Sequence, residues 1–188
     1  MMQTAEQLRF SATDFLAWEE SQAEKHEFVA GEVFAMVGAR REHFVVSGNI
    51  FAGLKQRLRG TPCRAYIADL KLRVEAADAF FYPDVIVSCH SADNKAEQYL
   101  TQPILIVEVL SDSTAAYDRG NKFAYYRCLD SLQEYVIVDI DSRRVECFRR
   151  ATDNEWLLHD YHGEDDCKFN SLSISLPLAE VFEDIGSV

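Results

Sequence analysis

The sequence predicts an α/β fold in which a mixed β-sheet is flanked by helices. Two observations lead to this prediction. The expected elements follow the order helix, strands, helix, strands. The segment PILIVEVL, residues 103–110, has apolar side chains on both faces, which is typical of a central strand covered from both sides. A chain of 188 residues can bury a core of its own, so we expect a single domain over residues 1–188.

Four helices are predicted from capping residues and from apolar side chains at helical spacing. Ser11 or Thr13 can cap the first helix, and Gly60 ends the second. The third helix begins with a run of candidate caps at 111–114. The predicted helices span residues 10–25, 41–60, 111–129 and 178–185.

The strands are predicted from short runs rich in β-branched and aromatic residues. Residues 26–38 form either two short strands hinged at Gly31 or one bent strand. Residues 134–141 and 143–150 form a hairpin around Asp141 and Ser142. The other predicted strands span residues 64–75, 80–89, 103–110, 155–161 and 171–176.

The charge of the chain is unevenly distributed. The net charge is −12, and residues 151–188 hold nine acids against one lysine. Residues 40–73 hold eight lysines and arginines against two acids, a net +6. An acidic chain argues against a nucleic-acid partner. A locally positive face can still bind a polyanion, because distant surface charges are screened. The alternative is that these cations are scattered over a solvated surface.

The cysteines and the apolar segments bear on localisation. The sequence has five cysteines, and no two of them form a C-x-x-C motif. This favours a reducing, cytoplasmic setting in which the thiols serve as small core residues. The first 15 residues contain no apolar run of signal-peptide length. Residues 103–110 are too few to cross a bilayer, so we expect no membrane association. The cysteines are Cys63, Cys89, Cys128, Cys147 and Cys167.

Two acidic residues occupy positions that a structural strand disfavours. Asp84 follows Pro83 inside the apolar segment 80–89, and Glu108 alternates with apolar residues in the segment 103–110. A buried carboxylate is costly unless it is paired, protonated or bound to a cation. The two acids are separated by a loop long enough to place their strands side by side. A divalent cation between them would relieve their repulsion, and a purely oxygen ligand set favours Mg²⁺ or Mn²⁺ over zinc.

Two alternatives remain open for these acids. Each acid could be exposed at the end of a strand, or each could pair with its own arginine. On the third predicted helix, Asp118, Lys122 and Tyr126 are spaced i, i+4, i+8 and share a face. Lys122 could therefore reach a metal-bound phosphate, or it could form a solvated surface pair with Asp118.

Several strings of the sequence, taken together, resemble a known family. These are HEFVAGEV, REH, YPDVIV, PILIVEVLSDST, YDRGNKFAYYR and EYVIVDI. They resemble the Uma-type restriction endonuclease family of the PD-(D/E)XK nuclease superfamily. The most specific part is VEVLSDST followed by D-x-x-x-K-x-x-x-Y. The resemblance covers about residues 11–150 and implies a restriction-endonuclease-like core there, with C-terminal strands and a short helix at 151–188.

The resemblance implies roles for individual residues. Asp84 and Glu108 correspond to metal-binding carboxylates on adjacent strands. Glu27 corresponds to a third acid, with Glu32 as the alternative if the alignment is shifted. The lysine expected two residues after the glutamate is replaced by Leu110, and the family resemblance places the amine on the following helix, at Lys122. His43 corresponds to a recurring histidine, for which we expect a supporting role.

These residues lead to a functional hypothesis. We expect a DNA endonuclease that depends on Mg²⁺ or Mn²⁺ and hydrolyses phosphodiester bonds, with Glu27, Asp84, Glu108 and Lys122 in its catalytic machinery. Cutting both strands requires two sites, so we expect a homodimer. The alternative is a nuclease-fold module that binds nucleic acid or regulates without cutting. A further alternative is a different α/β fold in which the carboxylates only form salt bridges.

Overall fold

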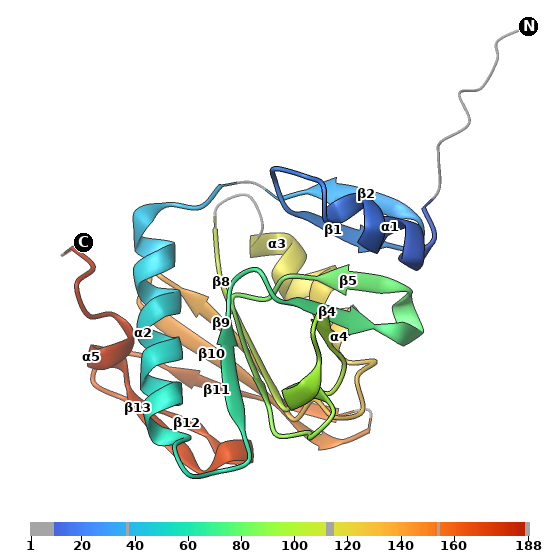
Figure 1. Cartoon of the computed structure of the whole chain (residues 1–188). Coiled ribbons are helices and arrows are strands. Elements are labelled where there is room, and N and C mark those ends of the chain that lie inside the picture. Colours follow the sequence, from blue (N-terminus) through green and yellow to red (C-terminus); the bar gives the residue numbers. More distant parts are fainter. Residues whose placement is uncertain (1–9, 37, 112–114, 154, 187–188) are drawn as a thin grey trace, which may run out of the picture.

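The fold is built on two β-sheets with helices packed on and between them (Figure 1). The computed structural model describes residues 10–36, 38–111, 115–153 and 155–186. Its α-helices are α1 (Ala12–Glu19), α2 (Arg41–Arg57), α3 (Ala115–Tyr117), α4 (Phe123–Tyr126) and α5 (Leu178–Val181). Its strands are β1 (His26–Val29), β2 (Glu32–Ala35), β3 (Arg64–Ile67), β4 (Lys71–Val74), β5 (Ala79–Phe81), β6 (Val85–Ser88), β7 (Tyr99–Leu100), β8 (Leu105–Val109), β9 (Glu134–Asp139), β10 (Arg144–Thr152), β11 (Glu155–Tyr161), β12 (Asp166–Phe169) and β13 (Ile174–Pro177).

The larger sheet has six strands in the order β11-β10-β9-β8-β6-β3. It is mixed, because β8 and β9 run parallel whereas the other neighbours are antiparallel. The smaller sheet has the order β2-β1-β5-β4-β7, and β12 and β13 pair separately. The prediction of a mixed sheet flanked by helices is therefore confirmed.

The central strand β8 has two buried faces, as its apolar pattern indicates. Leu105, Val107 and Val109 pack in one core cluster together with the apolar face of α2. Ile106 belongs to a second cluster, which contains residues of β4, β5 and α4. Because side chains alternate along a strand, Glu108 points toward this second cluster. A charged residue thus enters the space between the two sheets.

Two predicted strands are each divided between the sheets. Residues 80–89 form β5 in the smaller sheet and β6 in the larger one. The break falls at residues 82–84, where Pro83 has no N–H to donate to a ladder. Residues 64–75 divide in the same way, at Ala68 and Asp69, whose φ angles are 47° and 37°. The hinge at Gly31, with a φ of 92°, separates β1 from β2 as predicted.

The third predicted helix is not continuous. Between α3 and α4 the segment Asp118–Lys122, labelled η3, is a π-helical turn. A π-turn accommodates one more residue than an α-turn, and such turns are frequent at functional sites. The segment contains Gly120 and Asn121, which are poor α-helix formers. Of the predicted caps at 111–114, all but Ser111 lie outside the described residues.

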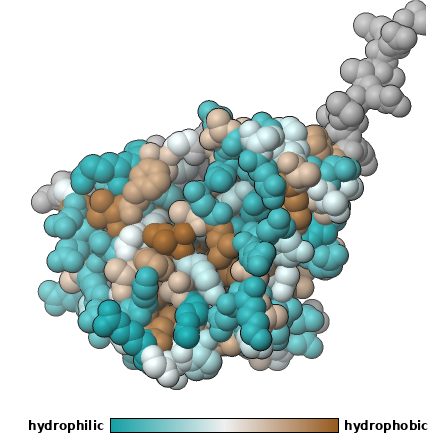
Figure 2. Space-filling model, in the orientation of Figure 1, coloured by the Kyte–Doolittle hydropathy of each residue, from teal (hydrophilic) through white to brown (hydrophobic). Residues whose placement is uncertain are grey.

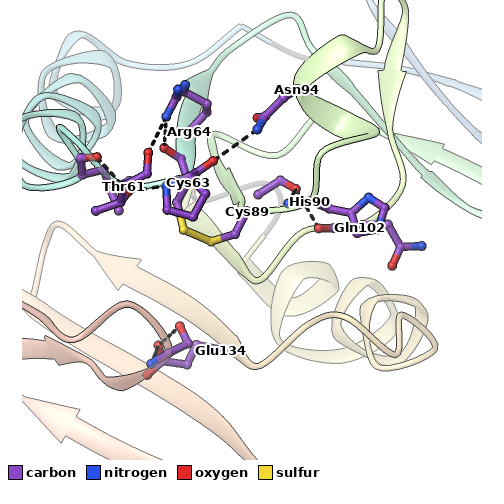
Figure 3. The surroundings of a disulfide bond; sticks show 12 residues. Thr61, Cys63, Arg64, Cys89, His90, Asn94, Gln102 and Glu134 are labelled. Carbon is purple, nitrogen blue, oxygen red and sulfur yellow. Dashed lines mark hydrogen bonds between the residues drawn. A yellow bond between two sulfur atoms is a disulfide. The ribbon is translucent and has the colours of Figure 1, made fainter.

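The expectation that all five cysteines are free thiols is wrong. Cys63 and Cys89 form a disulfide (Figure 3). The paired residues Arg64 and Ser88 come next to them in the ladder, so the register of β3 and β6 brings the two cysteines opposite each other. Cys147 and Cys167 are buried free thiols, whereas Cys128 is exposed. The spacing of cysteines in sequence carries no information about such cross-strand neighbours, and the disulfide removes the cysteine argument for a reducing setting.

Candidate functional site

Asp84 immediately precedes β6, and Glu108 lies on β8, the antiparallel neighbour of β6. The register pairs Val85 with Val107 and Ile86 with Ile106. One step further along this register, Asp84 comes opposite Glu108. Side chains at directly opposed positions have Cβ atoms about 4.5–5.5 Å apart. The convergence of the two acids follows from the register alone.

Asp84 is held at the edge of the sheet by two donors. The backbone N–H of Val109 donates to its Oδ2 at 2.7 Å. The Nε2 of His43, near the start of α2, lies 3.2 Å from the same oxygen. Burial lowers the pKa of His43, but the hydrogen bond and charge of Asp84 outweigh it, so that the pKa is raised overall. The imidazolium form of His43 is therefore favoured beside Asp84.

Glu108 is buried and contacts two side chains of the helical segment that follows its strand. The hydroxyl of Tyr126 donates to its Oε1 at 2.7 Å, and the Nζ of Lys122 lies 3.0 Å from the same oxygen. Burial raises the pKa of Glu108 to about 8, although the ammonium of Lys122 opposes the rise. The charges of Asp118 and Asp84 add to the increase. Burial and the two neighbouring acids thus disfavour the charged form of Glu108 despite its contact with Lys122.

Lys122 lies among three carboxylates. Its Nζ is 3.0 Å from Glu27 Oε1 on β1 and 3.7 Å from Asp118 Oδ1, in addition to its contact with Glu108. Burial alone would lower the pKa of Lys122, but the charges of Glu108, Glu27 and Asp118 raise it well above its ordinary value. The amine is therefore an ammonium ion that links the smaller sheet to the larger one.

The charges of this cluster favour an additional cation. Three carboxylates, those of Glu27, Glu108 and Asp118, surround one ammonium ion. The carboxylate of Asp84, with His43 beside it, adds further negative charge near Glu108. The Oε1 of Glu27 is buried and accepts no hydrogen bond of good geometry from any described residue. Hard oxygen ligands on adjacent strands suit Mg²⁺ or Mn²⁺, which bind through one or two carboxylates plus water and phosphate oxygens. The residues present therefore fit such an ion.

The arrangement does not form a closed metal cage. Within the described ranges no three His, Cys, Asp or Glu side chains converge in a geometry that could hold a metal ion. In this structure Lys122 lies between Glu27 and Glu108, where it neutralises both. An ion bound through Asp84 and Glu108 would complete its coordination with ligands from outside the chain.

Most of the residues singled out in the sequence gather at this one place. Glu27, Asp84, Glu108, Lys122 and His43 all take part. Within the described part of the chain, no arginine pairs with Asp84 or Glu108. Glu32, the alternative position for the third acid, does not take part. It lies on β2 opposite Val29 and is exposed.

Sequence reasoning missed a second buried network beside the site. The hydroxyl of Tyr82 donates to Glu19 Oε1 at 2.9 Å. The same carboxylate accepts the backbone N–H of His26 at 2.9 Å, and its other oxygen lies 3.0 Å from His26 Nδ1. Tyr82 is two residues from Asp84 and His26 adjoins Glu27, so this network anchors both acids. The one sequence signal for this network was Tyr82, which stands directly before Pro83. The sequence could not show that Glu19 is buried, because an acid on an amphipathic helix usually faces solvent.

The basic stretch 40–73 is not one free positive face. Arg57 forms two hydrogen bonds with the carboxylate of Glu180. Arg73 is buried on β4 and pairs with Glu75 and Asp78. These two arginines are used in structural ion pairs, so the stretch does not present all of its cations to a polyanion.

The fold and the site geometry define a restriction-endonuclease-like protein. A crystal structure of a "putative nuclease belonging to DUF820" from Anabaena variabilis has the same fold, with a TM-score of 0.73. That likeness covers 92% of this chain and 97% of the other, at 16% sequence identity. Residues 12–179 match the Uma2 family, described as "Putative restriction endonuclease". The chain belongs to the Uma2 family.

Two relatives from Synechocystis sp. extend the comparison. The chain is 34% identical over 178 residues to the uncharacterized protein slr1290, which covers 95% of this chain and 94% of that protein. It is also 34% identical over 168 residues to the uncharacterized protein sll1609, covering 88% and 94%. Among the residues described, no helix is both long and apolar enough to cross a membrane.

Proposed function

We propose that the chain is a metal-dependent nuclease that hydrolyses phosphodiester bonds in DNA with Mg²⁺ or Mn²⁺. The observation that carries this proposal is the opposition of Asp84 and Glu108 on adjacent strands, with the ammonium of Lys122 3.0 Å from Glu108. Membership of the Uma2 family, whose description names a restriction endonuclease, supports the same reaction class. The solved structure with the same fold is described as a "putative nuclease", which adds support.

Asp84 and Glu108 would hold the cation. When bound, the ion would lower the pKa of a coordinated water and polarise the phosphate. The other groups act directly on the substrate or on each other. His43, favoured in its imidazolium form, holds Asp84 in place through Oδ2. Tyr126 fixes the rotamer of Glu108 through its hydroxyl.

Lys122 stabilises charge in this proposal. Its raised pKa means that the amine does not accept a proton from water at neutral pH. An ammonium positioned in a buried site can neutralise the negative charge that develops on the phosphate oxygens. Glu27, 3.0 Å from the ammonium, orients it and lies where it could also steer the attacking water.

The position two residues after Glu108 explains why the amine comes from elsewhere. Leu110 is buried in the same core cluster as Phe81 and Tyr126. A lysine there would have to leave that core. An amine from the helical segment η3 reaches the same carboxylate without disturbing the packing. The replacement by Leu110 is therefore compatible with activity.

A nuclease-fold module that binds without cutting is the second candidate. It is favoured by the contacts of Lys122, which neutralises Glu27 and Glu108 without a metal. One experiment separates the two candidates. Supercoiled plasmid is incubated with the protein and Mg²⁺ or Mn²⁺, using wild type, Asp84→Asn, Glu108→Gln and the matched control Glu32→Gln.

The enzyme is supported if wild type and Glu32→Gln nick the plasmid and both site variants do not. The circular dichroism spectra of all four proteins must be the same. If wild type cuts nothing with either metal and calorimetry detects no metal binding, the module is the correct assignment. We further propose that residues 1–188 act as one domain and that two copies associate, so that two sites can act on opposite strands.

A further inference from the structure

The exposed large apolar side chains are concentrated beside the proposed site. Figure 2 shows that most of the face drawn is hydrophilic, with a few hydrophobic residues among the polar ones. Five large hydrophobic side chains of the described part are exposed: Phe34, Met36, Phe44, Leu157 and Leu158. The two leucines lie on β11. The other three lie on or next to the elements that carry Glu27 and His43. Exposed apolar side chains that are grouped in one patch mark an interaction site, whereas single ones are ordinary.

Phe34 lies next to Glu27. The two residues are partners in the β1–β2 ladder, so their side chains project from the same face. Glu27 is nearly buried and contacts Lys122, whereas Phe34 is 48% exposed. The hairpin therefore presents a free aromatic ring immediately outside the carboxylate cluster.

Phe44 flanks the cluster from the other side. It follows His43 on α2, and the centroids of the two rings are 5.8 Å apart in an edge-on arrangement. His43 in turn contacts Asp84 at 3.2 Å. Phe44 is 64% exposed, although it lies in the first turn of a well-packed helix. α2 begins at the same end of the molecule as the β1–β2 hairpin (Figure 1).

Two lysines accompany these rings. The Nζ atoms of Lys25 and Lys71 lie 6.0 Å and 5.6 Å from the ring centroid of Tyr82. Lys25 is two residues from Glu27, and Tyr82 is two residues from Asp84. No ion pair with either lysine occurs between residues that the structure describes, in contrast to Arg57 and Arg73. Free ammonium groups beside a phosphodiester site suit the phosphates of a bound strand.

We propose that the site takes DNA in single-stranded or locally unpaired form. Bases on either side of the scissile phosphate stack on Phe34 and Phe44, and the neighbouring phosphates contact Lys25 and Lys71. Rings exposed in this way serve only bases whose faces are open, and the faces of bases inside a duplex are covered by their neighbours. A long duplex would instead require a continuous basic surface, and much of the basic stretch is engaged in ion pairs. This inference rests on the proposed function.

Binding measured without cleavage tests the inference separately from the proposed function. Fluorescence anisotropy in EDTA compares a labelled 20-nucleotide mixed-sequence strand with its blunt duplex and with the same duplex carrying an unpaired gap. The strand and the gapped duplex should bind at least tenfold more tightly than the blunt duplex. Phe34→Ala and Phe44→Ala should each weaken binding to the strand on the order of tenfold, because stacking of one base is lost. Phe34→Tyr and Phe44→Tyr, which keep an aromatic face, should restore affinity.

Leucine variants and remote controls sharpen the test. Phe34→Leu and Phe44→Leu keep an apolar side chain without a ring and should bind as poorly as the alanine variants. The control His162→Ala, which removes an exposed ring far along the chain, should change nothing. Lys25→Gln and Lys71→Gln should each make the slope of log affinity against log salt shallower by about 0.7, whereas Lys168→Gln should not.

Three results would overturn the inference. These are tighter binding to the blunt duplex, full affinity in both leucine variants, and a loss of self-association in the phenylalanine variants with unchanged DNA affinity. The last result would assign the rings to contact with a second copy of the chain. Failure of the proposed function gives a different pattern, because plasmid nicking would then be absent while the preference for unpaired DNA in EDTA could still be measured.

Discussion

The Nζ of Lys122 lies 3.0 Å from Glu27 on β1 and 3.0 Å from Glu108 on β8. One ammonium ion therefore connects a strand of the smaller sheet with the central strand of the larger one. The side chain comes from a π-helical turn between α3 and α4, and it is buried. Both the electrostatics of the site and the contact between the sheets depend on this group.

Lys122→Met should abolish plasmid nicking and also destabilise the fold. Removing one partner of a buried ion pair leaves uncompensated carboxylates, at a cost of about 3–5 kcal/mol. Urea unfolding measures the loss of stability and the plasmid assay measures the loss of activity. Lys168→Met serves as the matched control at an exposed position of β12. Unchanged stability in the Lys122 variant would show that the ammonium is not buried among the acids.

Mg²⁺ should raise the melting temperature of the wild-type protein. A ligand that binds only the native state stabilises it by about 2.7 kcal/mol at a hundredfold excess over its dissociation constant. For a chain of this size that corresponds to a shift of several degrees. Asp84→Asn and Glu108→Gln should remove the shift measured by scanning calorimetry, and Glu32→Gln should keep it. An equal shift in all four proteins would place the ion elsewhere.

Tyr126→Phe should cost about 1–3 kcal/mol, because Glu108 loses a buried hydrogen-bond donor. Nicking should weaken without disappearing, since Lys122 still contacts the carboxylate. The neighbouring Tyr125 stacks on Phe81, and its hydroxyl forms no hydrogen bond with the residues that the structure describes, so Tyr125→Phe is the matched control. Equal unfolding free energies for the two variants would contradict a specific role for the Tyr126 hydroxyl.

The five cysteines should react in three classes. Burial raises the pKa of Cys167 to about 12 and also raises the pKa of Cys147, so both thiols should resist a disulfide reagent at pH 8 in the native state. Cys128 is exposed and should react within seconds to minutes. Cys63 and Cys89 should react only after reduction. More than one fast thiol in the native, unreduced protein would contradict this arrangement.

Reduction of the disulfide should also lower stability. The two cysteines are separated by 26 positions in the sequence. A cross-link over a loop of this length stabilises the native state by about 3–4 kcal/mol, because it restricts the unfolded chain. The double variant Cys63→Ser, Cys89→Ser should show the same decrease in urea and should be insensitive to reductant. A reductant effect that persists in the double variant would have another origin.

The fold was largely predictable because its strongest signals are local. The two-sided apolar pattern of 103–110 predicted the central strand, and the apolar spacing of 41–60, with Gly60 as the stop, predicted α2. The divisions at residues 82–84 and at Ala68 were missed, because sheet membership depends on long-range pairing. Pro83 signalled the first break, yet nothing in sequence showed that its two halves enter different sheets.

The gathering of the site residues was predictable only with the resemblance. Spacing alone left Lys122 as a surface partner of Asp118, and burial by the second sheet changed that outcome. The Glu19–Tyr82 contact joins residues 63 positions apart and had no local signature. The disulfide was missed for the same reason, since it depends on the register of two strands.

The break at Pro83 places the carboxylate cluster at the junction between the two sheets. Because Glu27 lies on a strand of one sheet, Glu108 on a strand of the other and Asp84 at the break between them, neither sheet contains a complete set of functional groups. A substitution that shifts one sheet against the other by an ångström would separate these groups while leaving both ladders intact. Inactive variants of normal stability are therefore expected far from any carboxylate, wherever the two sheets touch.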